Sequence, residues 1–532
     1  MRSPLEDIRL KFQPKLPKIL EKLSQLSPVD NGTKSQIAPE VGTYFSHLSR
    51  TPEKITFTSK KKNQHDAHKV GVVFSGGPAP GGHNVISGLY DALKKLNKES
   101  QLIGFLNGPK GILEGNFIKI TEDLLANYRN QGGFDLIGTG RTKIETTDHF
   151  ESAERVARKL DLDGLVIIGG DDSNTNAAFL AEYFLSKNCK TTVVGIPKTI
   201  DGDLKNEEIE ISFGFDTASK VYSEFIGNVA RDALSAKKHT YFIKLMGRSA
   251  SHLTLECALS THPNMTLIGE EIAAAKKTLL QITHDIADII VARSEKGKDY
   301  GVILIPEGII EFIPEFKQLI AELDSIKSDQ MNADVVLTKL SKESAHCFKS
   351  LPHAIQEQLL GDRDAHGNVQ VSKIETERLL INAVKQELKE RAKAGVFKGT
   401  FTPQPLFCGY EGRCSMPSNF DAQYCYALGQ TAALFIDNQL TGYICYVSGL
   451  SHPVEEWGIG GRNLATMMGI EMRKGKAKPV IKKAMVDLHS RMFEEFKENR
   501  KKWALTDDYR QPGPIQFTDN PQVTDALTYM LK

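Results

Sequence analysis

Short apolar runs rich in β-branched residues alternate along the chain with longer segments whose apolar residues recur every three or four positions. In residues 164–203, the runs Leu165–Ile168 and Thr191–Ile196 flank the amphipathic segment Asn174–Leu185. Runs of this length predict buried strands, and the longer segment predicts a helix. The pattern therefore predicts a strand–helix–strand unit whose two strands lie parallel inside a sheet.

The same alternation continues on both sides of this unit. Val70–Phe74 and Thr240–Leu245 are each followed by a glycine-containing turn and a helical pattern, and Val302–Ile305 ends in another charged turn. Repeated strand, turn and helix predict an α/β fold with two doubly wound, Rossmann-like domains that face a shared cleft.

Three parts of the chain depart from this repeat of strand, turn and helix. Residues 1–68 are largely polar and predict an N-terminal extension packed on the main body. Residues 310–400 are rich in Lys, Glu, Leu and Ala, and they predict a mostly helical insertion. Near the C-terminus, Lys478–Lys502 predicts one more charged helix, whose basic residues form a solvated face.

The amino-acid composition limits which kinds of partner and which cellular location we expect. With 67 basic and 66 acidic residues the formal net charge is +1, which argues against nucleic acid or an anionic membrane as a partner. The seven cysteines include no C-x-x-C pair, so they predict neither a disulfide framework nor a zinc knuckle. The first residues lack the apolar core of a secretory signal, and no apolar run approaches the roughly 20 residues of a membrane helix. We therefore expect a soluble, cytoplasmic protein.

Charged residues follow both strands of the central unit at the point where each strand ends. The first strand is followed by Asp171 and Asp172, and the second by Lys198, Asp201 and Asp203. Ligands of such sheets bind beyond the carboxyl ends of the strands, so these side chains are expected in one crevice. Crowded carboxylates usually persist because a cation or a proton-transfer role requires them. Ordinary polar turns are the alternative for one strand end, and two neighbouring ends favour a site.

Glycine-rich turns in other parts of the chain suggest anion binding. Gly76 and Gly77 lie between a strand and a helix, where free backbone N–H groups can bind phosphate. The turn matches neither the dinucleotide fingerprint nor the P-loop, and a structural turn without a ligand explains it equally well. Arg141 follows a glycine-rich loop, and Met246-Gly247-Arg248 ends another predicted strand, so both arginines are candidate phosphate ligands.

Taken together, these motifs resemble those of the phosphofructokinases. Six of them occur in order: SGG-x-APGG, GGDDS, PKTIDGD, MGR, PEG and GYEGR. The resemblance covers about Val70–Gly308 and resumes over about Cys408–Met468. The N-terminal extension and the helical insertion are similar to those of the long-chain, pyrophosphate-dependent branch, which includes the catalytic β-type subunit of the plant enzyme.

The resemblance implies a glycolytic phosphotransferase that reversibly moves a phosphoryl group from pyrophosphate to the 1-hydroxyl of fructose 6-phosphate. It implies Asp201 as the base and Asp171 as the Mg²⁺ ligand, with Thr199 and Asp203 in supporting roles. Diphosphate binding is implied for Gly76, Gly77, Arg141, Asp172 and Lys198. Sugar phosphate binding is implied for Thr199, Ile200, Asp201, Met246, Gly247, Arg248, Glu307, Tyr410, Glu411, Gly412 and Arg413.

Further expectations concern the donor, the subunits and the domains. ATP-using relatives carry glycine where this chain has Asp172 and Lys198, so the pair implies pyrophosphate as donor. Lys238 and His239 occupy the region from which a neighbouring subunit completes the sugar site, which implies a homodimer or a larger assembly. Residues 69–212 with about 412–462 are expected to bind diphosphate and Mg²⁺, and residues 213–411 with about 463–532 to bind the sugar.

Other classes of protein share parts of the pattern. A noncatalytic regulatory subunit, such as the α-type partner in plant complexes, would not need intact Asp171, Lys198 and Asp201. An ATP-dependent phosphofructokinase is disfavoured by Asp172 and Lys198. A GGD-type kinase acting on a lipid or on NAD is disfavoured by the PKTIDGD, MGR and GYEGR set. A dehydrogenase would need the absent GxGxxG motif with its ribose-binding acid.

Overall fold

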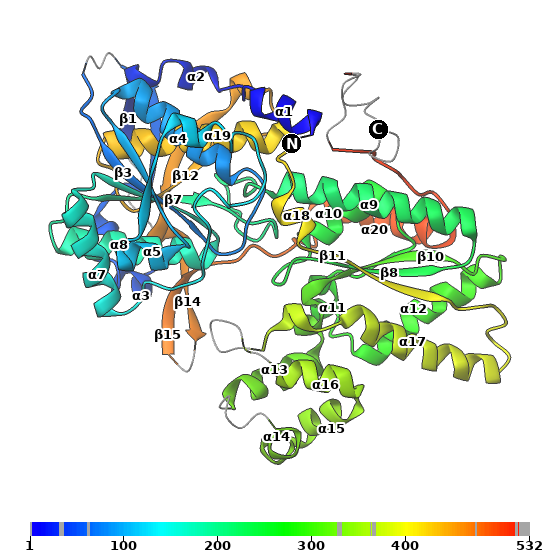
Figure 1. The fold of residues 1–532 in the computed structure, drawn as a ribbon. Helices are drawn as coiled ribbons and strands as arrows, with labels where there is room; N and C mark the ends of the chain where they lie inside the picture. The colour runs from blue at the N-terminus through cyan, green and yellow to red at the C-terminus, as the bar shows by residue number, and fades with distance from the viewer. Residues whose placement is uncertain are drawn as a thin grey trace.

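Two large β-sheets organise the part of the chain that the structure describes, with nine strands in one and four in the other (Figure 1). The computed structural model describes residues 3–30, 37–60, 64–326, 332–361, 363, 369–473, 476–515 and 520. Helices cover both faces of each sheet, which confirms the predicted doubly wound α/β class (Figure 1).

The larger sheet has a parallel centre with antiparallel strands at its edges. All six residues of β6 and all six of β7 are buried, as expected for strands covered on both faces. The parallel strands are β12 (Tyr443–Ser448), β7 (Thr192–Pro197), β6 (Gly164–Gly169), β3 (Lys69–Ser75) and β4 (Gln101–Phe105). The antiparallel strands are β1 (Leu26–Asp30), β2 (Lys54–Ser59), β13 (Gly458–Asn463) and β5 (Phe117–Ile120). The N-terminal segment therefore contributes two strands to this sheet.

Two long helices pack backbone to backbone on one face of the larger sheet. They are α4 (Gly82–Leu96) and α19 (Asn419–Asp437). A Cβ atom at Gly88 would lie 2.1 Å from the carbonyl oxygen of Tyr426, and one at Gly429 would lie 2.1 Å from that of Val85. Glycine is required at both positions because the two helix backbones approach each other too closely for a side chain. The other face carries α3 (Pro39–Gly42), α5 (Pro109–Glu114), α7 (Thr147–Leu160) and α8 (Asp171–Ser186) (Figure 1).

The smaller sheet is parallel throughout. Its strands, in spatial order, are β11 (Pro403–Cys408), β8 (Thr240–Leu245), β10 (Gly301–Pro306) and β9 (Met265–Thr266). Helices α9 (Phe215–Ala236), α10 (His252–Thr261) and α20 (Arg491–Leu505) cover one face. Helices α11 (Gly269–Ala274), α12 (Leu279–Ser294) and α17 (Thr376–Lys393) cover the other (Figure 1).

The predicted helical insertion is present and shares its core with the smaller sheet. Phe316 and Phe348 from the insertion belong to the same buried apolar cluster as Phe242 and Ile303 from the sheet. A 3₁₀ segment, Glu307–Phe312, leads into it, and the helices beyond that segment protrude below the sheet in Figure 1. They are α13 (Pro314–Ser325), α14 (Ala333–Lys339), α15 (Lys342–Ser350) and α16 (His353–Leu360).

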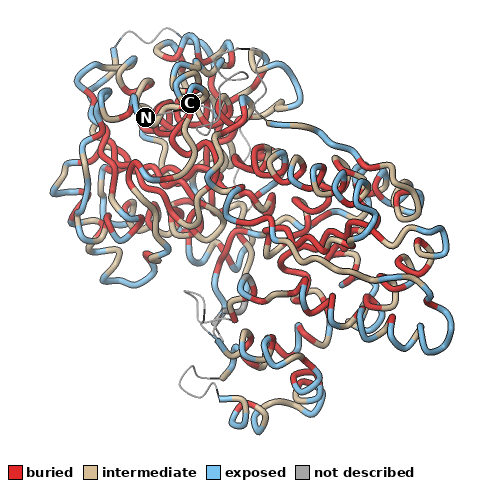
Figure 2. Tube along the Cα trace, turned by 45° about the vertical axis from the view of Figure 1, so that its right-hand side comes forward, coloured by how far each residue is buried: buried red, intermediate tan, exposed pale blue. Residues whose placement is uncertain are grey.

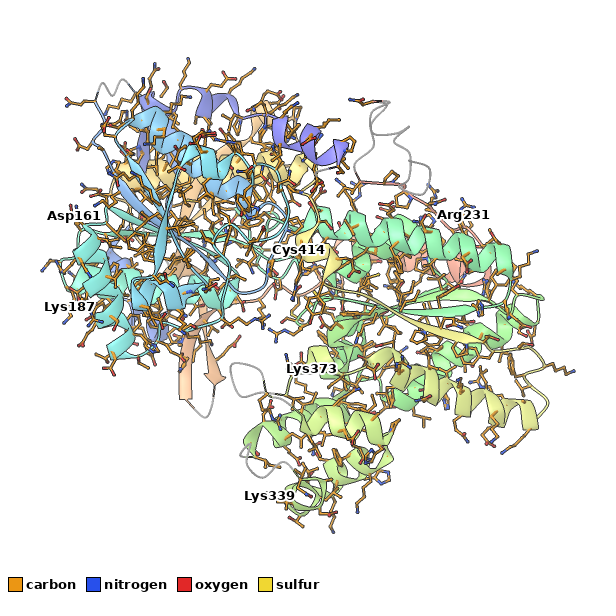
Figure 3. The ribbon with its side chains drawn as sticks, in the orientation of Figure 1. Asp161, Lys187, Arg231, Lys339, Lys373 and Cys414 are labelled. Atoms are coloured by element: carbon orange, nitrogen blue, oxygen red, sulfur yellow. The ribbon has the colours of Figure 1, made fainter. Side chains whose placement is uncertain are left out.

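Burial follows the two sheets. Figure 2 shows the buried residues along the central strands and the exposed residues on the outer surfaces of the helices. The chain returns from the smaller sheet to the larger one through α18 (Glu411–Cys414), and Figure 3 marks Cys414 between the two units. Among the described residues, no helix is long and apolar enough to cross a membrane.

The prediction of one charged helix over Lys478–Lys502 is wrong in its first half. Strands β14 (Met468–Arg473) and β15 (Lys476–Ile481) form a hairpin, and α20 begins only at Arg491. Pro479 removes a backbone donor that a helix interior would need, and Val480 is buried. The basic residues at 478–483 are therefore not the solvated face of a helix.

Candidate active site

A cavity of about 370 Å³ lies where the carboxyl ends of strands from both sheets meet. Ser75 ends β3, Gly170 and Lys198 follow β6 and β7, and Met246 and Glu307 follow β8 and β10. Strand ends of doubly wound sheets form ligand sites of this kind. Fifteen of the predicted site residues line the cavity. They are Gly76, Gly77, Arg141, Asp171, Asp172, Lys198, Thr199, Ile200, Asp201, Asp203, Met246, Arg248, Glu307, Tyr410 and Arg413.

The glycine turn brings two cations against the backbone. Gly76 has a φ of 88°, which favours glycine, and its N–H donates to the Gly140 carbonyl at 2.9 Å. A Cβ atom at Gly76 would lie 3.4 Å from Lys198 Nζ, and one at Gly77 would lie 3.3 Å from the guanidinium carbon of Arg413. The turn and the two cations therefore lie together on one positively charged part of the cavity wall.

Lys198 is buried under this turn. Its backbone N–H donates to the Gly169 carbonyl at 3.0 Å, which ties the end of β7 to the end of β6. Burial lowers the pKa of Lys198 to about 8, the positive charges of Arg413 and Arg141 act in the same direction, and Asp201 opposes them. The ammonium group is therefore partly desolvated and available to an anionic ligand.

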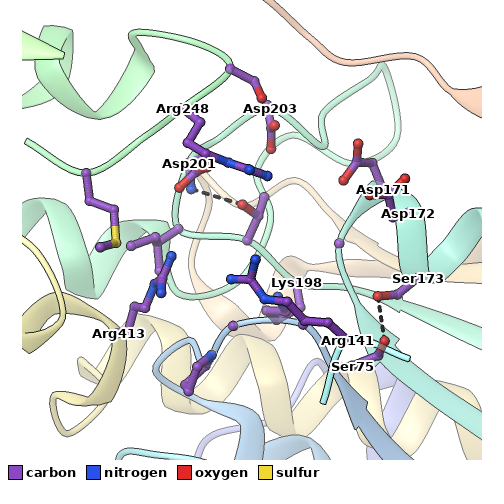
Figure 4. Close-up of a pocket in the computed structure, with 18 of the residues that line it drawn as sticks. Ser75, Arg141, Asp171, Asp172, Ser173, Lys198, Asp201, Asp203, Arg248 and Arg413 are labelled. Atoms are coloured by element: carbon purple, nitrogen blue, oxygen red, sulfur yellow. Dashed lines mark hydrogen bonds between the residues drawn. The ribbon is translucent and has the colours of Figure 1, made fainter. Parts of the chain in front are cut away.

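Asp171, Asp172 and Asp203 bring three carboxylates to another part of the cavity. Asp171 and Asp172 begin α8, and Ser173 beside them donates to Ser75 Oγ at 2.8 Å (Figure 4). Burial, together with the negative charges of Asp201 and Asp171, raises the pKa of Asp203 to about 7. Carboxylates that repel one another in this way would be stabilised by a cation bound among them.

The loop that carries Asp201 is held by its own residues. The Asp201 N–H donates to Thr199 Oγ1 at 3.0 Å, forming the kind of turn in which a hydroxyl accepts from the backbone two residues on (Figure 4). Figure 4 shows the Asp201 carboxylate beside Arg248, at the side of the cavity away from Asp171.

Residues from the smaller sheet complete the other wall. Glu307 is buried and accepts from the Gly247 N–H at 3.0 Å; burial raises its pKa, and so does Asp201. A Cβ atom at Gly308 would lie 1.7 Å from the Arg248 carbonyl oxygen, so the backbones of these two loops are in contact. The Arg413 guanidinium lies 5.4 Å from the ring centroid of Tyr410.

Five predicted residues do not line the cavity. Gly247, Glu411 and Gly412 adjoin residues that do, and the Glu411 carboxylate accepts from the Gly409 N–H at 2.9 Å. Lys238 and His239 precede β8, whereas Met246 follows it. Six residues of strand span about 20 Å, so this pair lies far from the cavity of its own chain.

Several cavity residues escaped the sequence analysis. Lys143 Nζ lies 3.8 Å from Asp172 Oδ1, and Lys483 Nζ lies 3.7 Å from Asp171 Oδ2. Ser249 follows the MGR motif directly, which was a usable signal, whereas Lys483 lies in a basic run with no local signal. The additional lining residues include Thr142, Lys143, Asn176, Ser249, Arg363, Gln370 and Lys483.

The part of the chain that the structure describes contains no group of three or more His, Cys, Asp or Glu side chains able to hold a metal ion by themselves. Asp171 and Asp203 are the carboxylates best placed to share an ion with a ligand, because both line the cavity and repel each other.

Comparison with known proteins decides the family. The sequence model described as phosphofructokinase matches residues 69–436, which is more than half of the chain. The chain belongs to the phosphofructokinase family.

Relatives within the phosphofructokinase family match most of the chain. The pyrophosphate–fructose 6-phosphate 1-phosphotransferase subunit beta 1 of Arabidopsis thaliana is 57% identical, over 87% of this chain and 82% of its own. The pyrophosphate–fructose 6-phosphate 1-phosphotransferase of Porphyromonas gingivalis is 47% identical, over 100% of this chain and 98% of its own. The resemblance to the long-chain, pyrophosphate-dependent branch is confirmed.

A solved phosphofructokinase structure shares the fold. The pyrophosphate-dependent phosphofructokinase of Nitrosospira multiformis superposes with a TM-score of 0.56 and 15% identity, covering 86% of this chain and 95% of its own. At that identity the similarity concerns the arrangement of the two sheets and their helices.

Proposed function

We propose that this protein transfers a phosphoryl group from inorganic pyrophosphate to the 1-hydroxyl of fructose 6-phosphate, giving fructose 1,6-bisphosphate and phosphate. One observation carries the proposal: Asp172 and Lys198, the residues expected to select pyrophosphate, line the same cavity as Asp201, the expected base. The relatives from Arabidopsis thaliana and Porphyromonas gingivalis are named for this activity, and they match 87% and 100% of this chain.

In the proposed mechanism Asp201 takes the proton of the sugar 1-hydroxyl while that oxygen attacks the nearer phosphorus in line. The bond between this phosphorus and the bridging oxygen breaks, and phosphate leaves. Lys198 and Arg141 neutralise the leaving phosphate, and the turn at Gly76 and Gly77 supports it through the backbone. Thr199 keeps the Asp201 loop in place, as its hydrogen bond to the Asp201 N–H supports. Positioning and charge neutralisation supply most of the catalysis in this chemistry.

The proposed sugar site lies on the opposite wall. Arg248 and Arg413 bind the 6-phosphate, and Glu307 accepts from sugar hydroxyls. Ile200, Met246 and Tyr410 bound the ring, and Gly247, Glu411 and Gly412 shape the loops that carry these residues. In this proposal residues 69–212 with about 412–462 form the diphosphate domain, and residues 213–411 with about 463–532 form the sugar domain, containing the insertion.

Donor selection follows from size and charge. An ammonium group at residue 198 neutralises a compact phosphate leaving group, whereas a carboxylate at residue 172 repels the additional phosphate of a nucleotide. Burial of Lys198 strengthens its interaction with an anion.

The residues present fit a divalent metal ion, which we propose is Mg²⁺ held by Asp171, with Asp203 in support. Mg²⁺ is usually bound through one or two carboxylates, and substrate phosphates and water complete its shell. The mutual repulsion that raises the pKa of Asp203 is the condition that a cation relieves. When bound, the ion would supply charge neutralisation to the diphosphate.

We further propose a homodimer or larger assembly in which Lys238 and His239 of a second copy reach the 6-phosphate. Their place before β8 supports this, because the same residues cannot reach the cavity of their own chain. Cytoplasmic location is supported by the seven cysteines, none of which forms a disulfide.

Two alternatives keep the fold and change the activity. In one, the protein is a noncatalytic regulatory subunit; in the other, it uses ATP. Convergence of Asp171, Lys198, Asp201 and Arg248 in one cavity disfavours the first, and the presence of Asp172 and Lys198 disfavours the second.

The deciding experiment is an initial-rate assay with fructose 6-phosphate and Mg²⁺ that compares pyrophosphate with ATP. We expect turnover with pyrophosphate and little or none with ATP. Turnover with ATP alone would overturn the donor assignment, and no turnover with either donor would favour the regulatory subunit.

A further inference from the structure

A linking segment, residues 482–490, connects the β14–β15 hairpin beside the larger sheet to the helix α20 of the smaller one. Its backbone is hydrogen-bonded to Asp203 of the cavity and to Glu270 of α11. The Ala484 N–H donates to the Asp203 carbonyl at 2.7 Å, and the Val486 N–H donates to Glu270 Oε1 at 2.9 Å. The segment therefore has a defined position against the loop that carries Asp201 and Asp203.

The side chain of Lys483 enters the cavity from this segment. Its Nζ donates to Ser249 Oγ at 2.7 Å and lies 3.7 Å from Asp171 Oδ2. Ser249 follows Arg248, which faces the sugar side, and Asp171 begins α8 on the diphosphate side. One ammonium group thus spans the gap between the two proposed substrate sites.

This ammonium group is not saturated by the contacts that hold it. A separation of 3.7 Å exceeds hydrogen-bonding distance, and Ser249 is its hydrogen-bond acceptor among the described residues. A lysine has three N–H donors, so two remain for a ligand. Its side chain is 30% exposed, which leaves these donors access to the cavity.

The charges around the cavity point to the ligand that would use them. Lys198 lies against the glycine turn on one side, and Lys483 lies beside the carboxylate cluster on another. Lining residues include more cations than carboxylates, although the whole chain is almost neutral. The cationic residues are Arg141, Lys143, Lys198, Arg248, Arg363, Arg413 and Lys483. Such a surface suits two phosphorylated ligands at once.

We propose that Lys483 is a further phosphate-binding residue of this site, whose ammonium group binds oxygens of the phosphoryl group in transfer. The inference deepens the proposed function and rests on it. Negative charge on the transferred group is spread over its outer oxygens, and a cation between the donor and acceptor sites neutralises that charge. Ser249 orients the ammonium group toward this position.

A purely structural role makes a different prediction. If Lys483 only fastens the linking segment, its loss would loosen both sides of the cavity together, and diphosphate and sugar phosphate would both bind more weakly. If it binds the transferred group, diphosphate binding alone is weakened.

The test compares Lys483→Met, which removes the charge, with Lys483→Arg, which keeps it, and with Lys482→Met as a matched control. Lys482 is the exposed neighbour on the same segment and does not line the cavity. Two dissociation constants are measured by calorimetry with Mg²⁺ present: that of methylenediphosphonate, which is not cleaved, and that of fructose 6-phosphate. Initial rates with pyrophosphate are measured in parallel.

We expect Lys483→Met to weaken the binding of methylenediphosphonate roughly tenfold, as the loss of a charged hydrogen bond should. Its kcat should fall roughly a hundredfold, as on loss of a transition-state donor. Fructose 6-phosphate binding should change less than about twofold, Lys483→Arg should recover most of the diphosphonate affinity, and Lys482→Met should resemble the wild type.

Unchanged diphosphonate binding, or equal weakening of both ligands, would overturn the inference. Where Lys483→Met is too unstable to purify, Lys483→Gln removes the charge while keeping a donor. The same two dissociation constants are then measured for that variant. Failure of the proposed function is seen separately, because the wild-type enzyme would then show no turnover with pyrophosphate.

Discussion

Lys198 Nζ lies beside the turn at Gly76, 3.4 Å from the position that a Cβ atom would occupy there. This proximity couples a buried cation to a glycine turn that follows a different strand. The two parts of the proposed diphosphate site therefore depend on each other's geometry.

Gly76→Ala should impair pyrophosphate binding through the backbone. The φ of 88° disfavours alanine by about 1–2 kcal/mol, and any relaxation moves the turn relative to Lys198. We expect the KM for pyrophosphate to rise roughly tenfold with a small change for fructose 6-phosphate. Gly395→Ala is the matched control, because its φ is 75° and nothing lies within 4 Å of its added Cβ. Equal kinetic effects of the two variants would contradict this reasoning.

Lys198→Gly should remove most activity with pyrophosphate. Losing a buried cation that faces the leaving phosphate should lower kcat/KM for pyrophosphate roughly a hundredfold. Combined with Asp172→Gly, the change should open the donor side to ATP. The measurement is kcat/KM for both donors in the single and double variants. Pyrophosphate activity that survives, without any gain of ATP activity, would refute the assigned roles.

Activity with pyrophosphate should fall as the pH rises through the pKa of Lys198. Burial and the neighbouring arginines lower that pKa to about 8, so the ammonium is present below pH 8 and lost above it. We expect kcat/KM for pyrophosphate to decline on the basic side of about pH 8. The Lys198→Gly variant provides the control, since its profile should lack this decline. The same decline in the variant would assign it to another group.

Mixing two impaired variants should restore activity if the sugar site is completed by a second copy, when fructose 6-phosphate is kept too dilute for Lys238→Met to turn over. Asp201→Asn removes the base and should lower kcat roughly a thousandfold, and Lys238→Met should weaken fructose 6-phosphate. In a hybrid, one site carries both changes and the other carries neither. Unfolding and refolding an equal mixture should recover about a quarter of the wild-type activity. If activity stays at the average of the two variants, Lys238 does not act across subunits.

Residues close together in a motif were predictable as site residues. Asp171 and Asp201 follow adjacent parallel strands, and the carboxyl ends of such strands meet at one edge of a sheet whatever the rest of the chain does. Hydrophobic patterning was sufficient for these strands because both of their faces are buried.

Lys483 and the N-terminal strands could not be predicted in this way. Lys483 reaches Asp171 only because the chain crosses between the two units after a hairpin, and no local pattern encodes that crossing. β1 and β2 are short and only partly apolar, and β2 joins the sheet by pairing with β13 from the far end of the chain. Contacts between segments so far apart in sequence depend on the finished fold rather than on local preference.

The pairing of β2 with β13 also bears on how the protein is made. Arg462 on β13 forms an ion pair with Glu53, 409 positions earlier. At roughly 5–20 residues per second, a ribosome needs on the order of 20–80 s to span that distance. Throughout this interval the first strands to emerge lack their neighbour in the sheet and present open edges. Yield in a cell should therefore depend on chaperones that shield the first sixty or so residues until the last strand of the sheet has been synthesised.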